Sequence, residues 1–205
     1  MTLEQTEIEL KKLTVMPPWG RKQNDDWDKL SNFVYQQPSY EQLLALIAAQ
    51  DKDEAFGNYC IHRWYNTLSA RALEEVFCSQ PRVKANKNKY DKLVDFSISS
   101  IPFDHKTSIY PRGYPETQAY AEQNPASLIK WLYKQQSLEG RYHTENRLFV
   151  VLYAADGQHW RLRAEISKMK TAIEDYVLHF DKKNLTLLML EEESAVLSDI
   201  VWIKL

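Results

Sequence analysis

Alternating apolar and polar residues are clearest in two consecutive segments, residues 93–98 and 101–108. Successive side chains of a strand point to opposite faces, so this alternation fits strands with one apolar and one polar face. The dipeptide Ser99-Ser100 between the segments has the length of a tight hairpin loop. The pattern therefore predicts a β-hairpin.

In this hairpin Asp95 lies opposite Asp104, on the face that also carries Lys106 and Ser108. Directly opposed β-carbons are about 4.5–5.5 Å apart, a separation at which two unpaired carboxylates repel. A hard cation with oxygen ligands would remove this repulsion. The alternative is an ordinary solvated face, on which Asp and Lys form a weak cross-strand pair. The other face is apolar apart from one histidine and consists of Val94, Phe96, Ile98, Ile101, Phe103 and His105.

Helical and strand patterns follow one another along the rest of the chain. Residues 53–78 are helical in pattern, and the pattern ends before Gln80-Pro81, as a proline stop predicts. The mixture of elements predicts an α/β domain. Further helices are expected at residues 1–13, 25–35, 39–49, 125–136 and 166–180, and further strands at residues 148–153, 159–163, 185–190 and 200–203.

Length and cysteine content bound the kind of protein. A chain of 205 residues, 44% of them hydrophobic, is long enough for one sizeable core, so we expect a single domain, 1–205, with residues 1–50 as an N-terminal helical cover and residues 51–205 as the core. Its two cysteines, Cys60 and Cys78, lie about five turns apart on one predicted helix and cannot pair within it. We therefore expect a reduced, cytoplasmic chain, and no apolar segment is long enough to span a membrane.

Charge and motif content narrow the function classes. The net charge of −2 argues against a protein that coats nucleic acid over its whole surface. The five glycines form no phosphate-binding loop, and the sequence holds neither paired cysteine ligands for zinc nor a Gly-x-Ser-x-Gly elbow. One local basic run precedes the hairpin and is either a solvated loop or a rim that contacts phosphates: Arg82, Lys84, Lys87, Lys89 and Lys92.

At Asp95 and at Asp104-His105-Lys106 the chain resembles the PD-(D/E)XK nuclease superfamily, whose signature is an acid on one strand and acid-x-Lys on the next. The proline that often precedes the first acid is replaced here by Val94. The resemblance implies a restriction endonuclease-like fold, in which helices flank a central mixed β-sheet in a nuclease-like core, and hydrolysis of a phosphodiester. It also implies Mg²⁺ or Mn²⁺ at Asp95 and Asp104, with the backbone carbonyl of His105 as a further ligand. Lys106 would orient the attacking water.

The same resemblance assigns roles to two helices. A further metal-binding acid usually comes from the helix before the hairpin, where Glu75 continues the apolar spacing of Trp64, Leu68 and Ala72 and Glu74 is the substitute if the helix is rotated. Many members also carry a glutamine on the helix after the lysine strand. Gln136 has that position here, although a glutamine at the edge of the core is an equally good interpretation.

Candidate substrate contacts lie around these elements. Tyr110 and Arg112 follow the lysine strand, and Arg141 and Arg147 belong to a polar cluster before the next apolar strand. Side chains of this kind bind phosphate oxygens. The complete expected set of substrate residues is Lys84, Lys87, Lys89, Ser108, Tyr110, Arg112, Arg141 and Arg147.

The sequence and the resemblance together lead to the hypothesis of a Mg²⁺-dependent nuclease that acts on DNA, in restriction, phage defence or repair. Two alternatives stay open. One is a non-catalytic module that binds nucleic acid or a partner protein on a nuclease fold, and the other is a ribonuclease. We expect no membrane partner, and both a monomer and a homodimer are compatible with the sequence.

Overall fold

The computed structural model describes residues 1–19, 26–88, 93–138, 145–189 and 195–205. Contacts along the chain divide it into two compact units. The first, here called the helical unit, consists of Met1–Leu73 and Arg163–Ser167, and the second, the sheet unit, of Glu74–Leu162 and Lys168–Leu205. No helix in the described part of the chain is long and apolar enough to cross a membrane.

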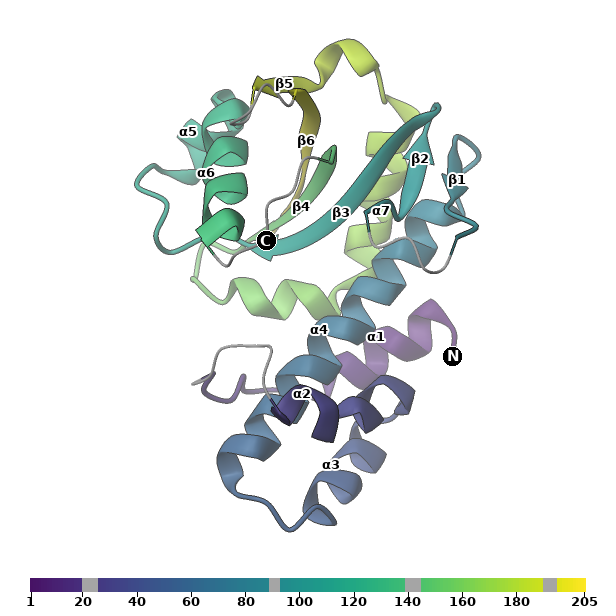
Figure 1. Cartoon of the computed structure of the whole chain (residues 1–205), viewed down its shortest axis with the longest axis vertical. Helices are drawn as coiled ribbons and strands as arrows, with labels where there is room; N and C mark the ends of the chain where they lie inside the picture. Colours follow the sequence, from purple (N-terminus) through teal and green to yellow (C-terminus); the bar gives the residue numbers. More distant parts are fainter. Residues whose placement is uncertain (20–25, 89–92, 139–144, 190–194) are drawn as a thin grey trace. The chain divides into compact units, whose positions relative to one another are not determined.

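The helical unit is built from short helices with side-chain caps and from most of one long helix (Figure 1). Thr2 caps α1 in a reciprocal capping box with Gln5, and Ser39 caps α3 through the backbone N–H of Gln42. Buried Leu10, Leu43 and Trp64 are among its core residues. The elements are α1 (Leu3–Lys11), α2 (Asp26–Leu30), the 3₁₀ helix η1 (Asn32–Gln36), α3 (Tyr40–Ala48) and α4 (Glu54–Cys78) up to Leu73.

The sheet unit contains a six-stranded mixed sheet in the order β1-β2-β3-β4-β6-β5 (Figure 1). Strands β1, β2 and β3 form an antiparallel meander, β3, β4 and β6 run parallel, and β5 pairs antiparallel with β6. The predicted α/β class with a central mixed sheet is confirmed. The strands are β1 (Val83–Ala85), β2 (Phe96–Ile98), β3 (Ile101–Ile109), β4 (Arg147–Tyr153), β5 (Thr186–Met189) and β6 (Ala195–Lys204).

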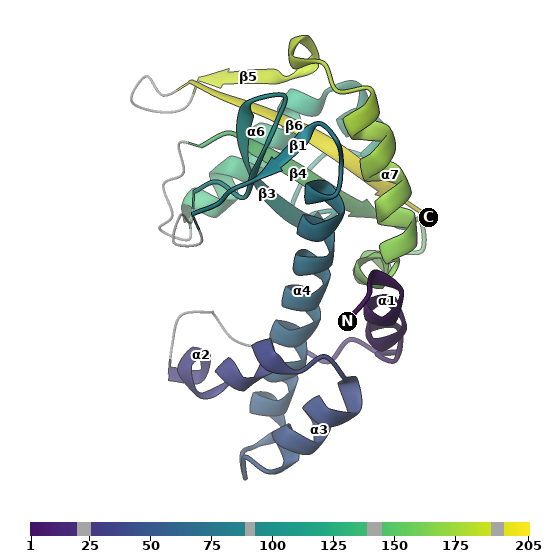
Figure 2. The same ribbon diagram turned by 90° about the vertical axis from the view of Figure 1, so that its right-hand side faces the viewer.

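Helices cover both faces of this sheet (Figure 2). On one face, α6 packs its buried Ile129 and Tyr133 against Phe149 and Val151 of β4. On the other, the end of α4 brings Phe77 onto Phe96 of β2, and α7 follows beside it. These helices are α5 (Gln118–Gln123), α6 (Pro125–Leu138) and α7 (Ile166–Leu178), joined by the 3₁₀ helices η2 (His159–Ala164) and η3 (Lys182–Asn184).

The predicted hairpin register is confirmed. Ile98 pairs with Ile101 and Phe96 with Phe103. Both loop serines have positive φ, 47° for Ser99 and 72° for Ser100. Positive φ at both central residues is typical of the two-residue turn whose twist matches that of paired strands. The turn therefore fixes which residues of β3 face which layer of helices.

Two local predictions were wrong. The basic run before the hairpin contains a strand, β1, which pairs with β2 and was not expected. Residues 159–163 were expected to return as a strand after Asp156-Gly157, but they form the 3₁₀ helix η2. The physical reason is that β3 and β6 occupy both edges of β4, so a strand following β4 has no free edge beside it.

Candidate functional site at the start of β3

Asp104 is an acid held between two cations on the α6 side of the sheet. Its side chain is 5% exposed, Oδ1 accepts a hydrogen bond from Lys106 Nζ at 2.6 Å, and Oδ2 accepts one from Arg147 Nε at 3.0 Å. Lys106 is two residues further along β3, whereas Arg147, at the start of β4, is the residue that pairs with Asp104 across the two strands. The backbone N–H of Asp104 donates to the Asn146 carbonyl at 3.0 Å. Both the side chain and the backbone of Asp104 are therefore fixed.

Arg147 was expected to contact substrate, and its burial overturns that role. The side chain is 0% exposed and its Cζ lies 5.4 Å from the centre of the Tyr133 ring on α6. Nη1 and Nη2 have no hydrogen-bond partner among the residues that the structure describes. A substrate phosphate cannot reach a guanidinium enclosed in this way, so the contact that defines Arg147 is the one to Asp104.

Asp95 has a different environment from Asp104. It lies one residue before β2, its backbone N–H donates to the Phe103 carbonyl at 2.9 Å, and strand pairing ends at Phe96. Its Oδ2 accepts the backbone N–H of His105 at 2.8 Å and lies 2.8 Å from His105 Nδ1. The expected pair of facing, unpaired carboxylates is therefore not formed. Asp95 is hydrogen-bonded to His105, and Asp104 is hydrogen-bonded to Lys106 and Arg147.

Electrostatics agree with this geometry. Burial by itself raises the pKa of Asp95, but the hydrogen bonds and charge of His105 and the charge of Lys106 hold it below its ordinary value. His105 is buried on the apolar face, as predicted, with its ring 5.8 Å from that of Phe96 and 6.1 Å from that of Phe77. Packing of His105 thus fixes the orientation of Asp95. The role of the His105 carbonyl as a metal ligand stays a prediction.

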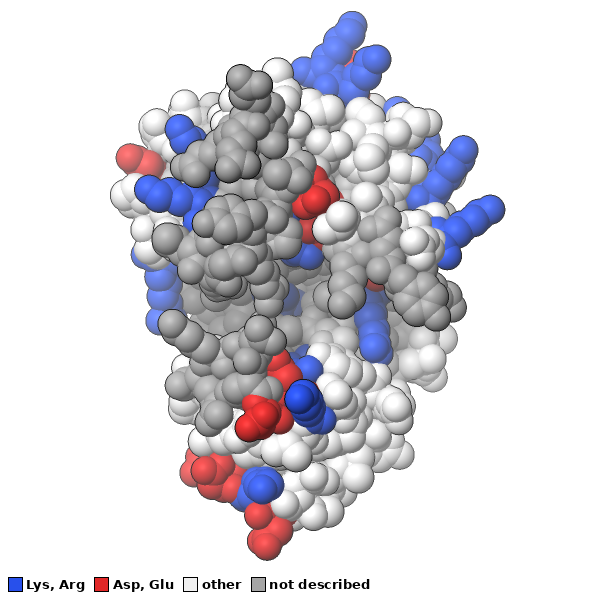
Figure 3. All heavy atoms as spheres, viewed as in Figure 1, with Lys and Arg blue, Asp and Glu red and all other residues white. Residues whose placement is uncertain are grey.

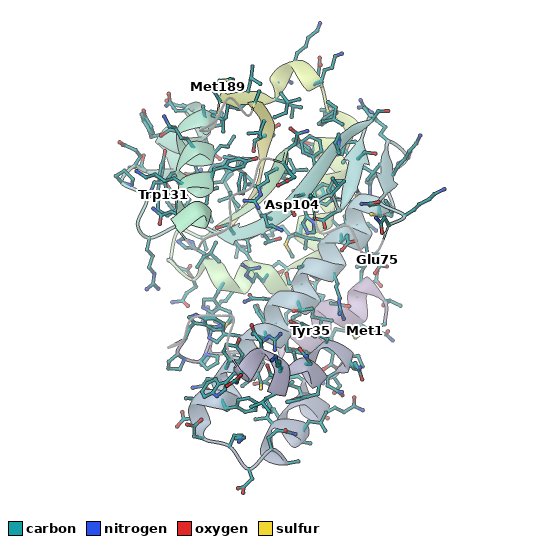
Figure 4. All side chains as sticks on the ribbon, in the orientation of Figure 1. Met1, Tyr35, Glu75, Asp104, Trp131 and Met189 are labelled. Atoms are coloured by element: carbon teal, nitrogen blue, oxygen red, sulfur yellow. The ribbon has the colours of Figure 1, made fainter. Side chains whose placement is uncertain are left out.

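The helical acid near this cluster is Glu74 rather than Glu75. Glu75 was expected on the apolar face of α4, but it is exposed, because the helix is rotated so that its buried positions near this end are Leu73, Val76 and Phe77. Residues three apart share a side of a helix, so Glu74 lies on the side of Phe77, which touches His105. In Figure 4 the labelled Glu75 and Asp104 lie apart, one on α4 and the other on β3.

Cys78 gives an independent indication of where Glu74 lies. Burial, together with the negative charges of Glu74 and Asp95, raises the pKa of the Cys78 thiol to about 11. Both carboxylates are therefore close enough to Cys78 to act on it. Glu74 on α4 and Asp95 before β2 thus both act on the Cys78 thiol through their charge.

A divalent metal fits the donors of this cluster in kind. Carboxylate oxygens are the ligands that Mg²⁺ and Mn²⁺ prefer. Both bonds from His105 use Oδ2 of Asp95, which leaves Oδ1 for a ligand, and the Asp95 side chain is 32% exposed. Lys106 is 41% exposed and free to swing away from Asp104. Within the described residues, however, no three or more His, Cys, Asp or Glu side chains already form a metal-binding group.

The expected phosphate-contacting residues before the hairpin differ in their exposure and in their contacts. Lys84 and Lys87 are exposed, and Figure 3 shows Lys and Arg side chains projecting from the edge where Figure 1 draws β1. Arg82 is instead engaged, because it donates to the carbonyls of Val177, Leu178 and Phe180 at the end of α7. Predictions for Lys89 and Arg141, and for the side chain of Gln136, fall outside the described residues.

The residues expected after the lysine strand lie at the far end of β3. Asp104 and Ile109 are five residue steps apart along β3, which is roughly 17 Å of strand. Near the far end the Ser108 hydroxyl donates to the Ile109 carbonyl at 2.9 Å. Beyond it the Tyr110 hydroxyl donates to the Glu116 carbonyl at 2.8 Å, and Arg112 is exposed. The structure therefore does not bring Tyr110 and Arg112 to the acids.

Comparison of the chain with protein-family models, curated proteins and solved structures finds no match in any of the three.

Sequence reasoning missed the partnership of Arg147 with Asp104. The signal that could have found it is the position of Arg147 directly before an unbroken apolar run, where a charged residue is drawn into the sheet and needs a buried counter-ion. Three residues of the site predicted from the sequence lie together in the structure: Asp95, Asp104 and Lys106. They are joined by His105, Arg147 and Glu74, and we call this set the β3 cluster.

Proposed function

We propose that this protein is a metal-dependent phosphodiesterase of the nuclease type that acts on DNA. The observation that carries the proposal is the ion pair between Asp104 and Lys106 on one face of β3, with Asp95 beside them at the start of β2. The resemblance to the PD-(D/E)XK superfamily rests on the same three residues. A mixed sheet with flanking helices supports it as well, because that is the core which the resemblance implies.

Five residues of the β3 cluster have a task in this proposal. Asp95 and Asp104, with Glu74 from α4, would hold the metal, which supplies an activated water and neutralises charge on the phosphate when bound. Lys106 directs its ammonium at the attacking water and at the oxygens on which charge develops. His105 holds Asp95 in place.

The test is cleavage of a labelled DNA duplex in Mg²⁺ or Mn²⁺, with single-stranded DNA and RNA run in parallel to identify the substrate. We expect cleavage that EDTA abolishes and that Lys106→Ala lowers by at least about 100-fold, since one group that stabilises developing charge is worth that much. The matched control is Lys134→Ala, an exposed lysine on α6, which should cleave like the wild type. Cleavage that survives EDTA or Lys106→Ala would contradict the proposal.

A second function, metal-independent binding of nucleic acid without cleavage, is favoured by one observation. The carboxylates of Asp95 and Asp104 already have His105, Lys106 and Arg147 as partners. The charges of Lys106 and Arg147 equal in number those of Asp95 and Asp104, so these two carboxylates need no metal for charge balance. DNA binding that is equal in EDTA and in Mn²⁺, without any product, would establish this function instead.

A further inference from the structure

Arg147 has an environment that packing alone does not explain. Its guanidinium is fully buried, and Nη1 and Nη2 have no hydrogen-bond partner in the described part of the chain. Burying a charged group with donors unsatisfied costs stability, and an apolar side chain of similar length avoids that cost. The Tyr133 ring, 5.4 Å from Cζ, compensates in part through its π-face. What the position gains in return is the contact with Asp104.

That contact divides the two oxygens of Asp104. Arg147 Nε donates to Oδ2 at 3.0 Å, which leaves Oδ1 to Lys106, 2.6 Å away. Rotation about χ2 of an aspartate is broad. A carboxylate without a fixed donor can therefore rotate, and the direction in which each of its oxygens points is not set. Arg147 is held by its place in β4 and by Tyr133, whereas Lys106 is partly exposed on a flexible stem. The fixed partner thus sets the orientation, and the mobile partner uses the free oxygen.

We propose that Arg147 is a positioning residue, which orients Asp104 so that Oδ1 is the oxygen presented to Lys106 and to a metal. This inference rests on the proposed phosphodiesterase function. Arg147 touches neither substrate nor reacting atoms, because it is enclosed, and it acts only through Asp104. Residues that orient a metal ligand in this way commonly account for 10–100-fold in metal affinity or activity.

The experiment compares Arg147→Met and Arg147→Lys with the wild type by calorimetric Mn²⁺ titration, by kcat and KM for DNA cleavage, and by thermal unfolding. We expect Arg147→Met to bind Mn²⁺ about 10-fold more weakly and to lose about 100-fold in kcat, with KM within about twofold of the wild type. Arg147→Lys should regain part of kcat, because an ammonium can still donate to Oδ2. Arg161→Met, an exposed arginine over the Trp160 ring, is the control and should match the wild type.

Each other outcome decides against the inference in a recognisable way. A raised KM with unchanged kcat would make Arg147 a substrate contact, and a lower melting temperature with unchanged Mn²⁺ affinity and kcat would make it structural only. If Arg147→Met does not fold, Arg147→Lys carries the test, and wild-type kcat and Mn²⁺ affinity in that variant overturn the inference. A wild-type protein that neither binds Mn²⁺ nor cleaves would refute the proposed function itself, whereas normal wild-type activity with normal Arg147 variants refutes only the positioning role.

Discussion

Asp104, which is buried, and Asp199, which is half-buried, lie on opposite faces of the same sheet and have contrasting partners. Asp104 faces α6 and bonds to two cations, Lys106 and Arg147. Asp199 faces α7, where its Oδ2 accepts the Tyr176 hydroxyl at 2.9 Å and its Oδ1 accepts the backbone N–H of Ile200 at 2.8 Å. Burial raises the pKa of Asp199 because the hydrogen bonds from these neutral donors do not offset it.

The contrast shows that the partners of an acid, and not its burial alone, decide whether it can bind a cation. A carboxylate with neutral donors is pushed toward its protonated form, in which it is a poor ligand for a divalent cation. A carboxylate with cationic partners stays charged inside the protein, at a cost in desolvation that a purely structural position does not require. A buried acid is therefore weak evidence for a site, and the cations around Asp104 are what single it out.

Replacement of Asp104 should produce the largest effect. Asp104→Ala leaves the enclosed Arg147 without its counter-ion, so we expect loss of cleavage and a free energy of unfolding lower by about 3–5 kcal/mol. Urea denaturation at pH 7 measures the second effect. If the carboxylates of Asp95 and Asp104 faced each other without partners, removing one acid would instead relieve repulsion and raise the melting temperature. A more stable Asp104→Ala protein would bring that interpretation back.

A double variant serves as the control for this prediction. Asp104→Leu together with Arg147→Met removes both charges and leaves no buried ion alone, so its stability should return to within about 2 kcal/mol of the wild type. Cleavage should stay absent in the double variant. If the double variant is as unstable as Asp104→Ala, the loss comes from packing rather than from the ion pair.

The two glutamates at the end of α4 give an intermediate effect. Glu74→Gln should weaken Mn²⁺ binding by about 10-fold, as loss of a group beside the ligands commonly does, whereas Glu75→Gln should leave affinity unchanged. Both side chains are exposed, so neither variant should alter stability by more than about 0.5 kcal/mol. Calorimetric titration of the pair decides between them. Weaker binding in Glu75→Gln alone would mean that the helix face was assigned correctly from the sequence.

Contacts between residues close in the sequence could be predicted, whereas contacts between residues far apart in the sequence could not. The loop and register of the hairpin could be predicted because a two-residue loop and alternation are local, although the strand before the loop begins at Phe96 rather than at residue 93. The partner of Asp104 is 43 residues away, and the parallel register that joins β3 to β4 is set by the assembled sheet. Arg147 therefore looked like part of a polar loop.

The acid on α4 was assigned wrongly for a related reason. The stripe that contained Glu75 included buried Trp64 and Ala72 but omitted the neighbouring residues Tyr65, Leu73 and Phe77, which are also buried. A helix that is apolar around much of its circumference does not reveal which side meets the sheet. Only the contact of Phe77 with Phe96 and His105 fixes that rotation.

The smallest effect is expected at Asp199, on the face without cations. Its pKa is raised in the folded state, so its protonated form favours folding, and that contribution is present below the ordinary pKa and is lost as the pH rises through the raised value. Asp199→Asn keeps an oxygen for the backbone N–H of Ile200, and its amide N–H can donate to the Tyr176 hydroxyl oxygen, so both contacts remain without a charge. It should therefore be equal to the wild type or more stable at pH 7, by less than about 1 kcal/mol, and the difference should shrink below pH of about 4. Urea denaturation at both pH values, with cleavage unchanged, checks this. A large loss of stability or of cleavage in Asp199→Asn would contradict the contrast between the two faces, because it would show that Asp199 works as an ionised group.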